Sequence, residues 1–151
     1  MKFDVRSINH FILWKIPIAR IAGIRLRRTD EEQTVLELRH RWINQNPFGS
    51  VYFGVLVMGG ELATGIPLFK AVSESGHRIS MLVVHHQSTF TKKATGRIRF
   101  IFKDMAAIRR HLEAAIRSGE KEVFDLEAHA INENGDTVAT LLYRWSVKRL
   151  D

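Results

Sequence analysis

The chain has 151 residues, of which 23 are Lys or Arg and 16 are Asp or Glu, giving a formal charge of +7. This length and the 45% hydrophobic content predict one compact domain, residues 1–151, with a sizeable core. The sequence contains no cysteine, which excludes disulfide scaffolds, thiol nucleophiles and zinc motifs that use Cys. The basic excess fits nucleic acid, an anionic membrane surface or a phosphate-bearing small molecule as a partner.

Residues 5–20 predict a short amphipathic helix interrupted at Pro17. The apolar positions that recur at helical spacing are Ile8, Phe11, Ile12 and Ile16. Lys15 and Pro17 cut the apolar stretch and no small-residue cleavage site follows, so we expect no signal peptide and a cytoplasmic location. We favour docking of this segment on the domain, while Trp14, Lys15 and Arg20 leave contact with a membrane surface as the alternative.

Two strands are expected next, at residues 24–29 and 34–42, with the polar turn Asp30-Glu31-Glu32 between them. Side chains along the second strand alternate between two faces. The face expected to be apolar carries Leu36, Leu38, His40 and Trp42, and the opposite face carries Glu37, Arg39 and Arg41. A loop at residues 43–50 follows.

A long apolar run occupies residues 48–69, where Glu61 is the one charged residue. Its length and its Ala, Leu and Met content favour a buried helix at about residues 50–70, with Ser50 as the N-cap. The same run is the best candidate for a membrane span. Its glycines, Pro67 and the carboxylate near its middle disfavour that interpretation, because a charge is costly in lipid.

The last part of the chain predicts four strands and a helix. The strands are expected at residues 78–91, 95–103, 122–132 and 137–148, and the helix at about 104–118. Asp104 is its expected N-cap and Gly119 its end, and Asn134-Gly135 predicts a hairpin between the last two strands. We therefore expect an α+β fold in which one antiparallel sheet of about six strands, the last four as a meander, wraps around the apolar helix.

Glu61 requires an explanation, because a carboxylate in apolar surroundings resists ionisation unless it is paired or hydrated. Gly54, Gly59, Gly60 and Gly65 each disfavour a helix interior, which indicates that something packs closely against this backbone. In a purely structural interpretation Glu61 lies at a solvent-facing edge or caps a neighbouring backbone. In a functional one it belongs to a site.

The segment before Glu61 carries a pattern, Asn46-Pro47-Phe48-Gly49-Ser50-Val51-Tyr52-Phe53-Gly54. It resembles the hotdog-fold acyl-CoA thioesterases of the phenylacetyl-CoA thioesterase type, which have Asn-x-x-Gly, then His-Gly-Gly, then Asp or Glu. The matching positions are Asn46, Gly49, Gly54 and Glu61. Tyr52 stands in place of the His and Phe53 in place of the first Gly of the pair.

The resemblance covers the chain from about residue 23 onward. Residues 90–96 are similar to the family's strand-turn segment and residues 133–139 to its last hairpin. The helix after Asp104 and the extra N-terminal helix resemble an uncharacterised, thioesterase-like branch of the hotdog superfamily. The resemblance implies a hotdog fold that hydrolyses acyl-CoA or a similar thioester, with coenzyme A as part of the substrate and no other cofactor.

The resemblance also implies roles for single residues. The N–H groups of Phe53 and Gly54 hold the thioester oxygen, Glu61 attacks the thioester or activates water, and Asn46 orients the thioester or the water. Phe53 and Glu61 lie about 12 Å apart along one helix axis, so a single carbonyl carbon cannot touch both. The pattern therefore predicts a homodimer, or a dimer of dimers, in which Glu61 comes from the second subunit.

Two departures from the family pattern leave a second function open. Tyr52 cannot act as an imidazole, and Phe53 narrows the approach to the backbone. The alternative is a hotdog protein that binds acyl-CoA or lipid without catalysis. Hotdog dehydratases match less well, because they need a His where this chain has Asn46.

Basic side chains offer sites for the phosphates of coenzyme A. The i, i+2 pairs that share a strand face are Arg25/Arg27, Arg39/Arg41 and Arg97/Arg99. Most of these arginines are interpreted as part of a solvated face of the sheet. Lys92, Lys93 and Arg97 are the candidates for phosphate contact. With Gly49 and Tyr52 they make up the expected substrate-binding residues. Nucleic acid is disfavoured as a partner, since interleaved aromatics are sparse and no recognition motif occurs.

No metal site is expected. His85 and His86 are adjacent, so on a strand they point to opposite faces, and no ligand spacing accompanies them. The other histidines are isolated in the sequence.

Overall fold

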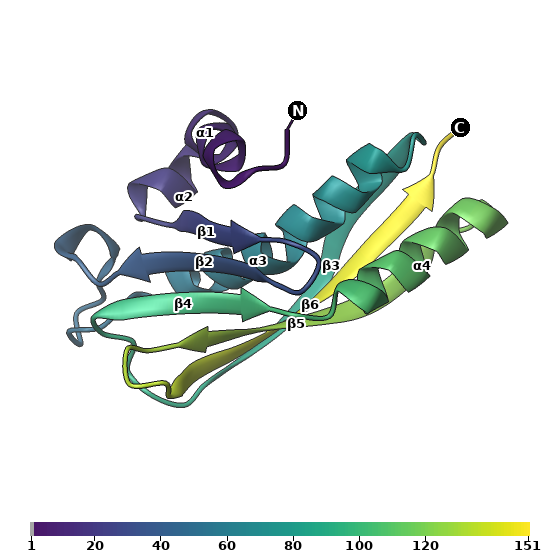
Figure 1. Cartoon of the computed structure of the whole chain (residues 1–151). Coiled ribbons are helices and arrows are strands. Elements are labelled where there is room, and N and C mark those ends of the chain that lie inside the picture. The colour runs from purple at the N-terminus through teal and green to yellow at the C-terminus, as the bar shows by residue number, and fades with distance from the viewer. Residues whose placement is uncertain (1) are drawn as a thin grey trace.

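The computed structural model describes residues 2–151. Two short helices, α1 (Val5–Lys15) and α2 (Pro17–Ile21), come first, followed by strands β1 (Arg25–Thr29) and β2 (Thr34–Arg39). A 3-10 helix, η1 (Trp42–Asn44), leads into the long helix α3 (Phe53–Glu74). The chain continues through β3 (Ile79–Phe90), β4 (Arg97–Phe102), α4 (Met105–Ser118), β5 (Glu122–Ile131) and β6 (Thr137–Arg149) (Figure 1). The predicted order of elements is confirmed.

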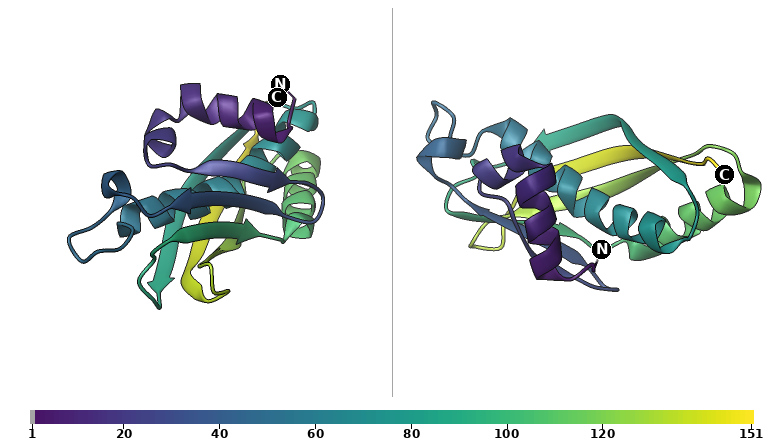
Figure 2. Two further views of the ribbon diagram at one scale, coloured as in Figure 1. Left: turned by 60° about the vertical axis from the view of Figure 1, so that its left-hand side comes forward. Right: turned by 90° about the horizontal axis from the view of Figure 1, so that it is seen from above.

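The six strands form one antiparallel sheet in the order β1-β2-β4-β5-β6-β3, which curves around α3 (Figures 1 and 2). The predicted meander is wrong for β3, because β3 pairs with β6 and not with β4. The connection after β3 crosses the end of the sheet, where Thr91 donates hydrogen bonds to the carbonyls of Val138 and Thr137. Alternation along a strand assigns its faces but does not specify its neighbours.

Helix α3 begins three residues later than the sequence predicts and ends later as well. Ser50 is not the N-cap; this position belongs to Tyr52, whose side chain makes no capping hydrogen bond. Val51 is held in extended backbone by its bridge to Gln45 and by the bond from its N–H to the Ala94 carbonyl. This pairing delays the helix until Phe53.

Close packing against the sheet explains two of the helix glycines. A Cβ at Gly59 would lie 2.3 Å from the Phe100 ring, and one at Gly60 would lie 2.6 Å from Leu141. The close approach predicted from the sequence is therefore confirmed, with the sheet as the neighbour. Within residues 2–151, α3 is the one helix long and apolar enough to cross a membrane, but more than half of its most apolar window is buried.

The second strand is shorter than predicted. Leu36 and Leu38 are buried as expected, but β2 ends at Arg39, and Trp42 is 81% exposed on η1. The expectation that Trp42 shares the buried face is wrong. The buried Asn44 side chain turns the chain here, since it donates to the carbonyls of Ala22 and Arg39.

The caps and turns of the C-terminal half agree with the sequence. Asp104 accepts a hydrogen bond from the Ala107 N–H and so caps α4. Gly119, with φ of +73°, ends this helix, and Gly135, with φ of +84°, forms the hairpin between β5 and β6. Both glycines occupy the left-handed region that other residues rarely adopt.

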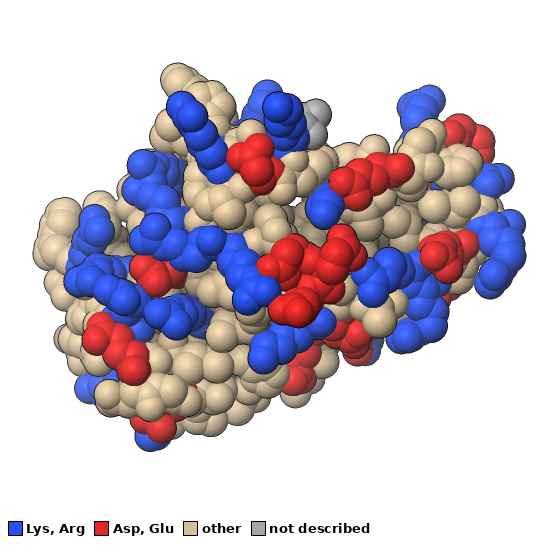
Figure 3. All heavy atoms as spheres, in the orientation of Figure 1, with Lys and Arg blue, Asp and Glu red and all other residues tan. Residues whose placement is uncertain are grey.

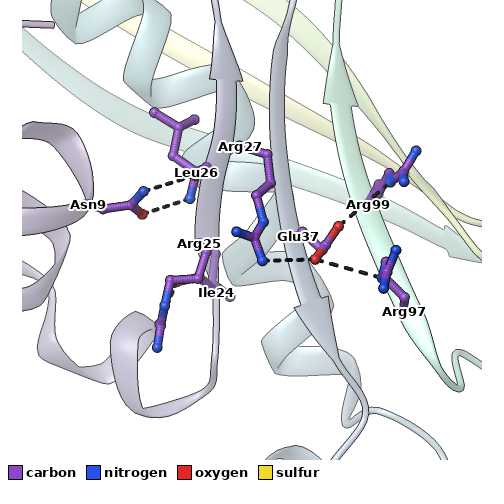
Figure 4. Close-up of polar contacts among 8 residues, drawn as sticks. All are labelled: Asn9, Ile24, Arg25, Leu26, Arg27, Glu37, Arg97 and Arg99. Carbon is purple, nitrogen blue, oxygen red and sulfur yellow. Dashed lines mark hydrogen bonds and ion pairs between the residues drawn. The ribbon is translucent and has the colours of Figure 1, made fainter. Parts of the chain in front are cut away.

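Helix α1 docks on the domain through one face, as predicted. Ile8 and Ile12 are buried in the core, and Asn9 forms two hydrogen bonds with the backbone of Leu26 in β1, each of 2.9 Å (Figure 4). Strand β1 lies at one edge of the sheet, and unpaired edge groups invite pairing with another chain. The Asn9 amide therefore protects this edge.

We expect Asn9→Ala to lower the free energy of unfolding by about 1–3 kcal/mol, because it leaves an N–H and a carbonyl of Leu26 without a partner. Urea unfolding followed by circular dichroism measures this loss. His10→Ala is the control on the same helix, since His10 is exposed and bonds nothing in β1 among the described residues. Equal stability of the two variants would contradict the role of Asn9.

Candidate functional site

A cavity of about 630 Å³ opens at the N-terminal end of α3. Its walls come from the loop before the helix and from the connection after β3. Five predicted site residues line it together: Asn46, Tyr52, Phe53, Lys92 and Lys93. The structure therefore joins two segments that lie far apart in the sequence.

The start of α3 presents free donors. The first turn contains no acidic residue, and the Tyr52 side chain does not cap it. The Tyr52 carbonyl accepts from the N–H groups of Val55 and Leu56, whereas those of Phe53 and Gly54 make no hydrogen bond within residues 2–151. Free N–H groups at the positive end of a helix dipole attract an anionic oxygen.

Asn46 and Gly49 form the turn that leads to this helix. The Asn46 Oδ1 accepts hydrogen bonds from the N–H groups of Phe48 (2.9 Å) and Ser50 (3.2 Å). Gly49 has φ of +76°, and its N–H donates to the Asn46 carbonyl. The Asn-x-x-Gly pattern is thus explained by loop geometry, because an Asn side chain that bonds the backbone ahead stabilises a turn.

Glu61 lies further along α3 and lines a different cavity, of about 180 Å³. The surrounding side chains are apolar and come from α1, α3, β3 and β6; they include Phe11, Leu62, Ile66, Phe69, Met81 and Trp145. Glu61 is the one charged residue in this lining among residues 2–151. Trp145 forms a fixed wall, since its Nε1 donates to the buried Thr64 Oγ1 at 3.1 Å.

Burial raises the pKa of the Glu61 carboxyl above its ordinary value of 4.5. Across the described chain, no hydrogen bond or ion pair reaches this carboxylate to offset the cost. Glu61 therefore caps no backbone and is half-buried rather than solvated. A carboxylate that is held poorly solvated beside an apolar cavity is a strong base for its type.

Residues 6–147 match the family described as a domain of unknown function, DUF4442. This chain belongs to the DUF4442 family. The match includes all the residues that line the cavity at the helix start, all but Phe3 of those that line the Glu61 cavity, and nearly every element of the fold. No curated protein sequence matches this DUF4442 chain.

Solved structures show that the DUF4442 chain has the hotdog fold, as the resemblance implied. A Pseudomonas aeruginosa protein of unknown function, described as a probable thioesterase, is 24% identical with a TM-score of 0.86, and the match covers 99% of each chain. A Chlorobaculum tepidum protein of unknown function is 17% identical with a TM-score of 0.82, covering 97% of this chain and 94% of that one. A Haemophilus influenzae thioesterase is 14% identical with a TM-score of 0.72, covering 99% and 94%.

Arg97 is separated from the other predicted substrate-binding residues of this DUF4442 protein. It precedes the buried Ile98 on β4, so its side chain lies on the outer face of the sheet, away from α3. There the Glu37 carboxylate lies 3.1 Å from Arg27 and 3.8 Å from both Arg97 and Arg99 (Figure 4). Figure 3 shows basic side chains gathered over β1, β2 and β4, with acidic groups among them. This pairing fits the interpretation of a solvated sheet face.

The histidines of β3 lie on opposite faces. His85 pairs in register with Arg144, and His86 pairs with Tyr143, whose ring it stacks on at 6.1 Å between centroids. No three His, Asp or Glu side chains of residues 2–151 gather as metal ligands.

Apart from Tyr52 and Phe53, the aromatic and apolar walls of the two cavities were not predicted as site residues from the sequence. Phe48 and Phe90 line the cavity at the helix start, and Met81 and Trp145 line the Glu61 cavity. These residues come from separate elements and resemble ordinary core positions, so no local signal marks them.

Proposed function

We propose that this DUF4442 protein hydrolyses acyl-CoA or a similar thioester at two sites, each shared between two subunits. The observation that carries the proposal is one helix with two complementary features. It has N–H donors at its start that are free among residues 2–151 and, about 12 Å along its axis, a carboxylate beside an apolar cavity that has no partner among the same residues. The names of the similar structures, a probable thioesterase and a thioesterase, support this reaction class.

The two features suit the two demands of thioester hydrolysis. Negative charge develops on the carbonyl oxygen, and the N–H groups of Phe53 and Gly54 can stabilise it. Glu61 removes a proton from water as the water oxygen bonds to the carbonyl carbon, or attacks that carbon itself. By the first route the carbon–sulfur bond then breaks, and Glu61 returns the proton to the leaving thiolate. By the second route the same bond breaks and the thiolate takes a proton from solvent, after which water hydrolyses the acyl anhydride on Glu61 and restores the carboxylate. Asn46 acts here through the loop that positions Phe53.

Shared sites require a dimer, and β3 provides the surface for it. Strand β3 is 12 residues long, lies at an edge of the sheet, and exposes Leu82 (62%) and Val84 (49%). The opposite edge is protected by Asn9, as described above. The Phe90 ring at the end of β3 contacts the Phe53 ring at 6.1 Å between centroids, so this open edge runs beside the start of α3.

Pairing of β3 with its own copy about a two-fold axis would extend the sheet across both subunits. The two α3 helices would then run antiparallel on the same side. In that arrangement the start of one helix can approach Glu61 of the other, and the same contact is repeated by symmetry. An antiparallel pair therefore offers two equivalent sites.

Lys92 and Lys93 stand at the mouth of the cavity and are candidates for the phosphates of coenzyme A. Both are exposed; Lys92 pairs with Asp136 at 3.0 Å, and Lys93 donates to the Phe48 carbonyl at 3.0 Å. Neither contact is buried, so a phosphate can replace it at low cost.

We expect Lys92→Ala/Lys93→Ala to raise KM for acyl-CoA several-fold and to leave kcat nearly unchanged, because distant phosphate contacts bind substrate and transition state equally. Steady-state kinetics with acyl-CoA and with the acyl N-acetylcysteamine thioester, which lacks the nucleotide, measure this effect. Lys121→Ala is the exposed control. An equal rise in KM for both thioesters would contradict phosphate contact.

One observation favours the alternative, an acyl-CoA-binding protein without catalysis. The Tyr52 ring lies over Gly54, where an added Cβ would be 2.7 Å from it, and the Tyr52 and Phe53 rings are 5.0 Å apart. These rings cover the approach to the helix start. A thioester must therefore pass these two rings to reach both N–H groups.

A panel of acyl-CoAs with aliphatic and aromatic acyl groups tests the proposal. Thiol release is measured with a thiol-reactive dye, and binding is measured by calorimetry on the same panel. We expect release for at least one acyl group. Binding without release would establish the alternative, and the absence of both would contradict any acyl-CoA function.

A further inference from the structure

Helices α1 and α2 carry a surface that the proposed hydrolysis does not use. This helix-pair surface consists of the exposed apolar residues Leu13, Trp14, Ile18 and Ile21, the helix cations Arg6, Lys15 and Arg20, and the adjoining Arg25 at the start of β1. Trp14 is 69% exposed, and Ile18 and Ile21 are each 59% exposed. The opposite face of α1 packs against the core, where Ile8 and Ile12 are buried. Trp14 lies in α1, and Ile18 and Ile21 lie in the adjoining α2; exposed apolar groups on adjoining helices indicate an interaction surface.

The charge of this surface is of one sign. A cavity of about 790 Å³ opens on it, and its lining includes all four cations together with Trp14. Among the described residues, this lining contains no Asp or Glu. Asp4 at the start of α1 is used as a cap, since its carboxylate accepts bonds from the N–H and Oγ of Ser7. The helix-pair surface therefore presents positive charge without a carboxylate to offset it.

We propose that the helix-pair surface docks on an anionic phospholipid bilayer. Tryptophan favours the boundary between lipid headgroups and acyl chains, and isoleucine side chains gain free energy by entering the chains. Lys and Arg are attracted to the lipid phosphates. Trp14, Ile18 and Ile21 supply the first set of contacts, and the four cations supply the second. This proposal is independent of the proposed hydrolysis.

Other occupants fit this surface less well. A second copy of the chain would bring the same cations together across a two-fold axis, and like charges repel. A nucleic acid would satisfy the cations but would leave Ile18 and Ile21 in water. The surface also lies beside β1, at the sheet edge opposite β3 (Figures 1 and 2), so lipid docking leaves the β3 edge free.

The position of α1 adds a consequence. Phe11 lines the cavity of about 790 Å³ on the outer side of α1 and also the Glu61 cavity on its inner side. A bilayer on the helix-pair surface is therefore separated from the Glu61 cavity by the thickness of one helix.

Co-sedimentation of the full chain with vesicles tests the proposal. We expect binding to mixed phosphatidylcholine–phosphatidylglycerol vesicles that weakens as salt rises, and much weaker binding to phosphatidylcholine alone. Lys15→Glu/Arg20→Glu is expected to lower the affinity by roughly 30-fold or more, since each basic residue near an anionic surface contributes about fivefold. Arg110→Glu/Lys148→Glu makes the same change in net charge at exposed positions on α4 and β6 and is expected to retain binding.

A second variant pair separates apolar contact from charge. Trp14→Ser is expected to weaken binding several-fold with no change in charge, whereas Val123→Ser, at an exposed apolar position on β5, retains it. Thermal unfolding verifies that each variant is folded. The proposal is overturned if the wild-type chain does not bind the anionic vesicles, or if Arg110→Glu/Lys148→Glu weakens binding as much as the α1–α2 variant. It is also overturned if the α1–α2 variant loses affinity for RNA or DNA but not for vesicles.

Discussion

Glu61→Gln is expected to lower kcat/KM for thioester hydrolysis by about 10²- to 10⁴-fold, the usual contribution of a positioned base. The amide keeps the shape of the side chain but cannot remove a proton or attack a carbonyl. Substrate affinity is expected to change little, because the cavity around Glu61 is otherwise apolar. Glu74→Gln, at an exposed position near the end of α3, is the matched control and is expected to retain full activity.

The raised pKa of Glu61 predicts how the activity and the stability of the wild-type chain depend on pH. Because burial raises the pKa of Glu61, the ionised form needed for hydrolysis is lost as pH falls through that raised pKa, above the ordinary 4.5. In the folded chain the carboxyl holds its proton to higher pH than in the unfolded chain. Its contribution to stability is therefore greatest below pH 4.5 and declines as pH rises through the raised pKa.

Glu61→Gln removes this pH-dependent loss of stability and is expected to raise the free energy of unfolding at neutral pH. Urea unfolding of both proteins across the pH range measures the difference, which is expected to grow from acidic to neutral pH. A variant that keeps its activity would refute the catalytic role. A stability difference that does not depend on pH would refute the role of burial.

Phe53→Pro is expected to lower the rate by about 10²- to 10³-fold, the cost of losing one oxyanion donor. Proline removes the Phe53 N–H but fits the first position of a helix. The preceding Tyr52 has φ of −60° and ψ of 133°, a conformation that a residue before proline readily adopts. The helix is therefore expected to remain intact, and thermal unfolding verifies this.

Phe53→Ala is the matched control, because it removes the same ring and keeps the N–H. We expect Phe53→Ala to hydrolyse thioesters at the wild-type rate or faster, since the ring narrows the approach to the helix start. If Phe53→Ala and Phe53→Pro lose activity equally, the side chain of Phe53 is important and its N–H is not.

The sequence predicts this fold well wherever the signal is local. The apolar run identifies α3, and Asp104, Gly119 and Gly135 mark ends and turns that the structure confirms. The sequence places the start of α3 too early, because a distant residue, Ala94, holds Val51 in extended backbone. The order of the sheet is missed for a similar reason, since pairing depends on contacts between segments far apart in the chain.

The candidate site is predictable only in part. Glu61 stands out as the one charge in an apolar run, and its raised pKa agrees with that expectation. Asn46 and Gly49 match a family pattern, and the structure gives both a role in the turn before α3. The walls of the Glu61 cavity include Phe11 from α1 and Met81 from β3, which no local pattern connects.

A mixture of two inactive variants tests the shared site most directly. Equal amounts of the Glu61→Gln protein and the Phe53→Pro protein are mixed, unfolded and refolded together. The thioesterase activity of the mixture is then measured. In a mixed dimer, the intact helix start of one subunit faces the intact Glu61 of the other, so one of its two sites is complete. Random pairing predicts recovery of about a quarter of the wild-type activity. Activity that stays at the sum of the two separate variants would contradict a site shared between subunits.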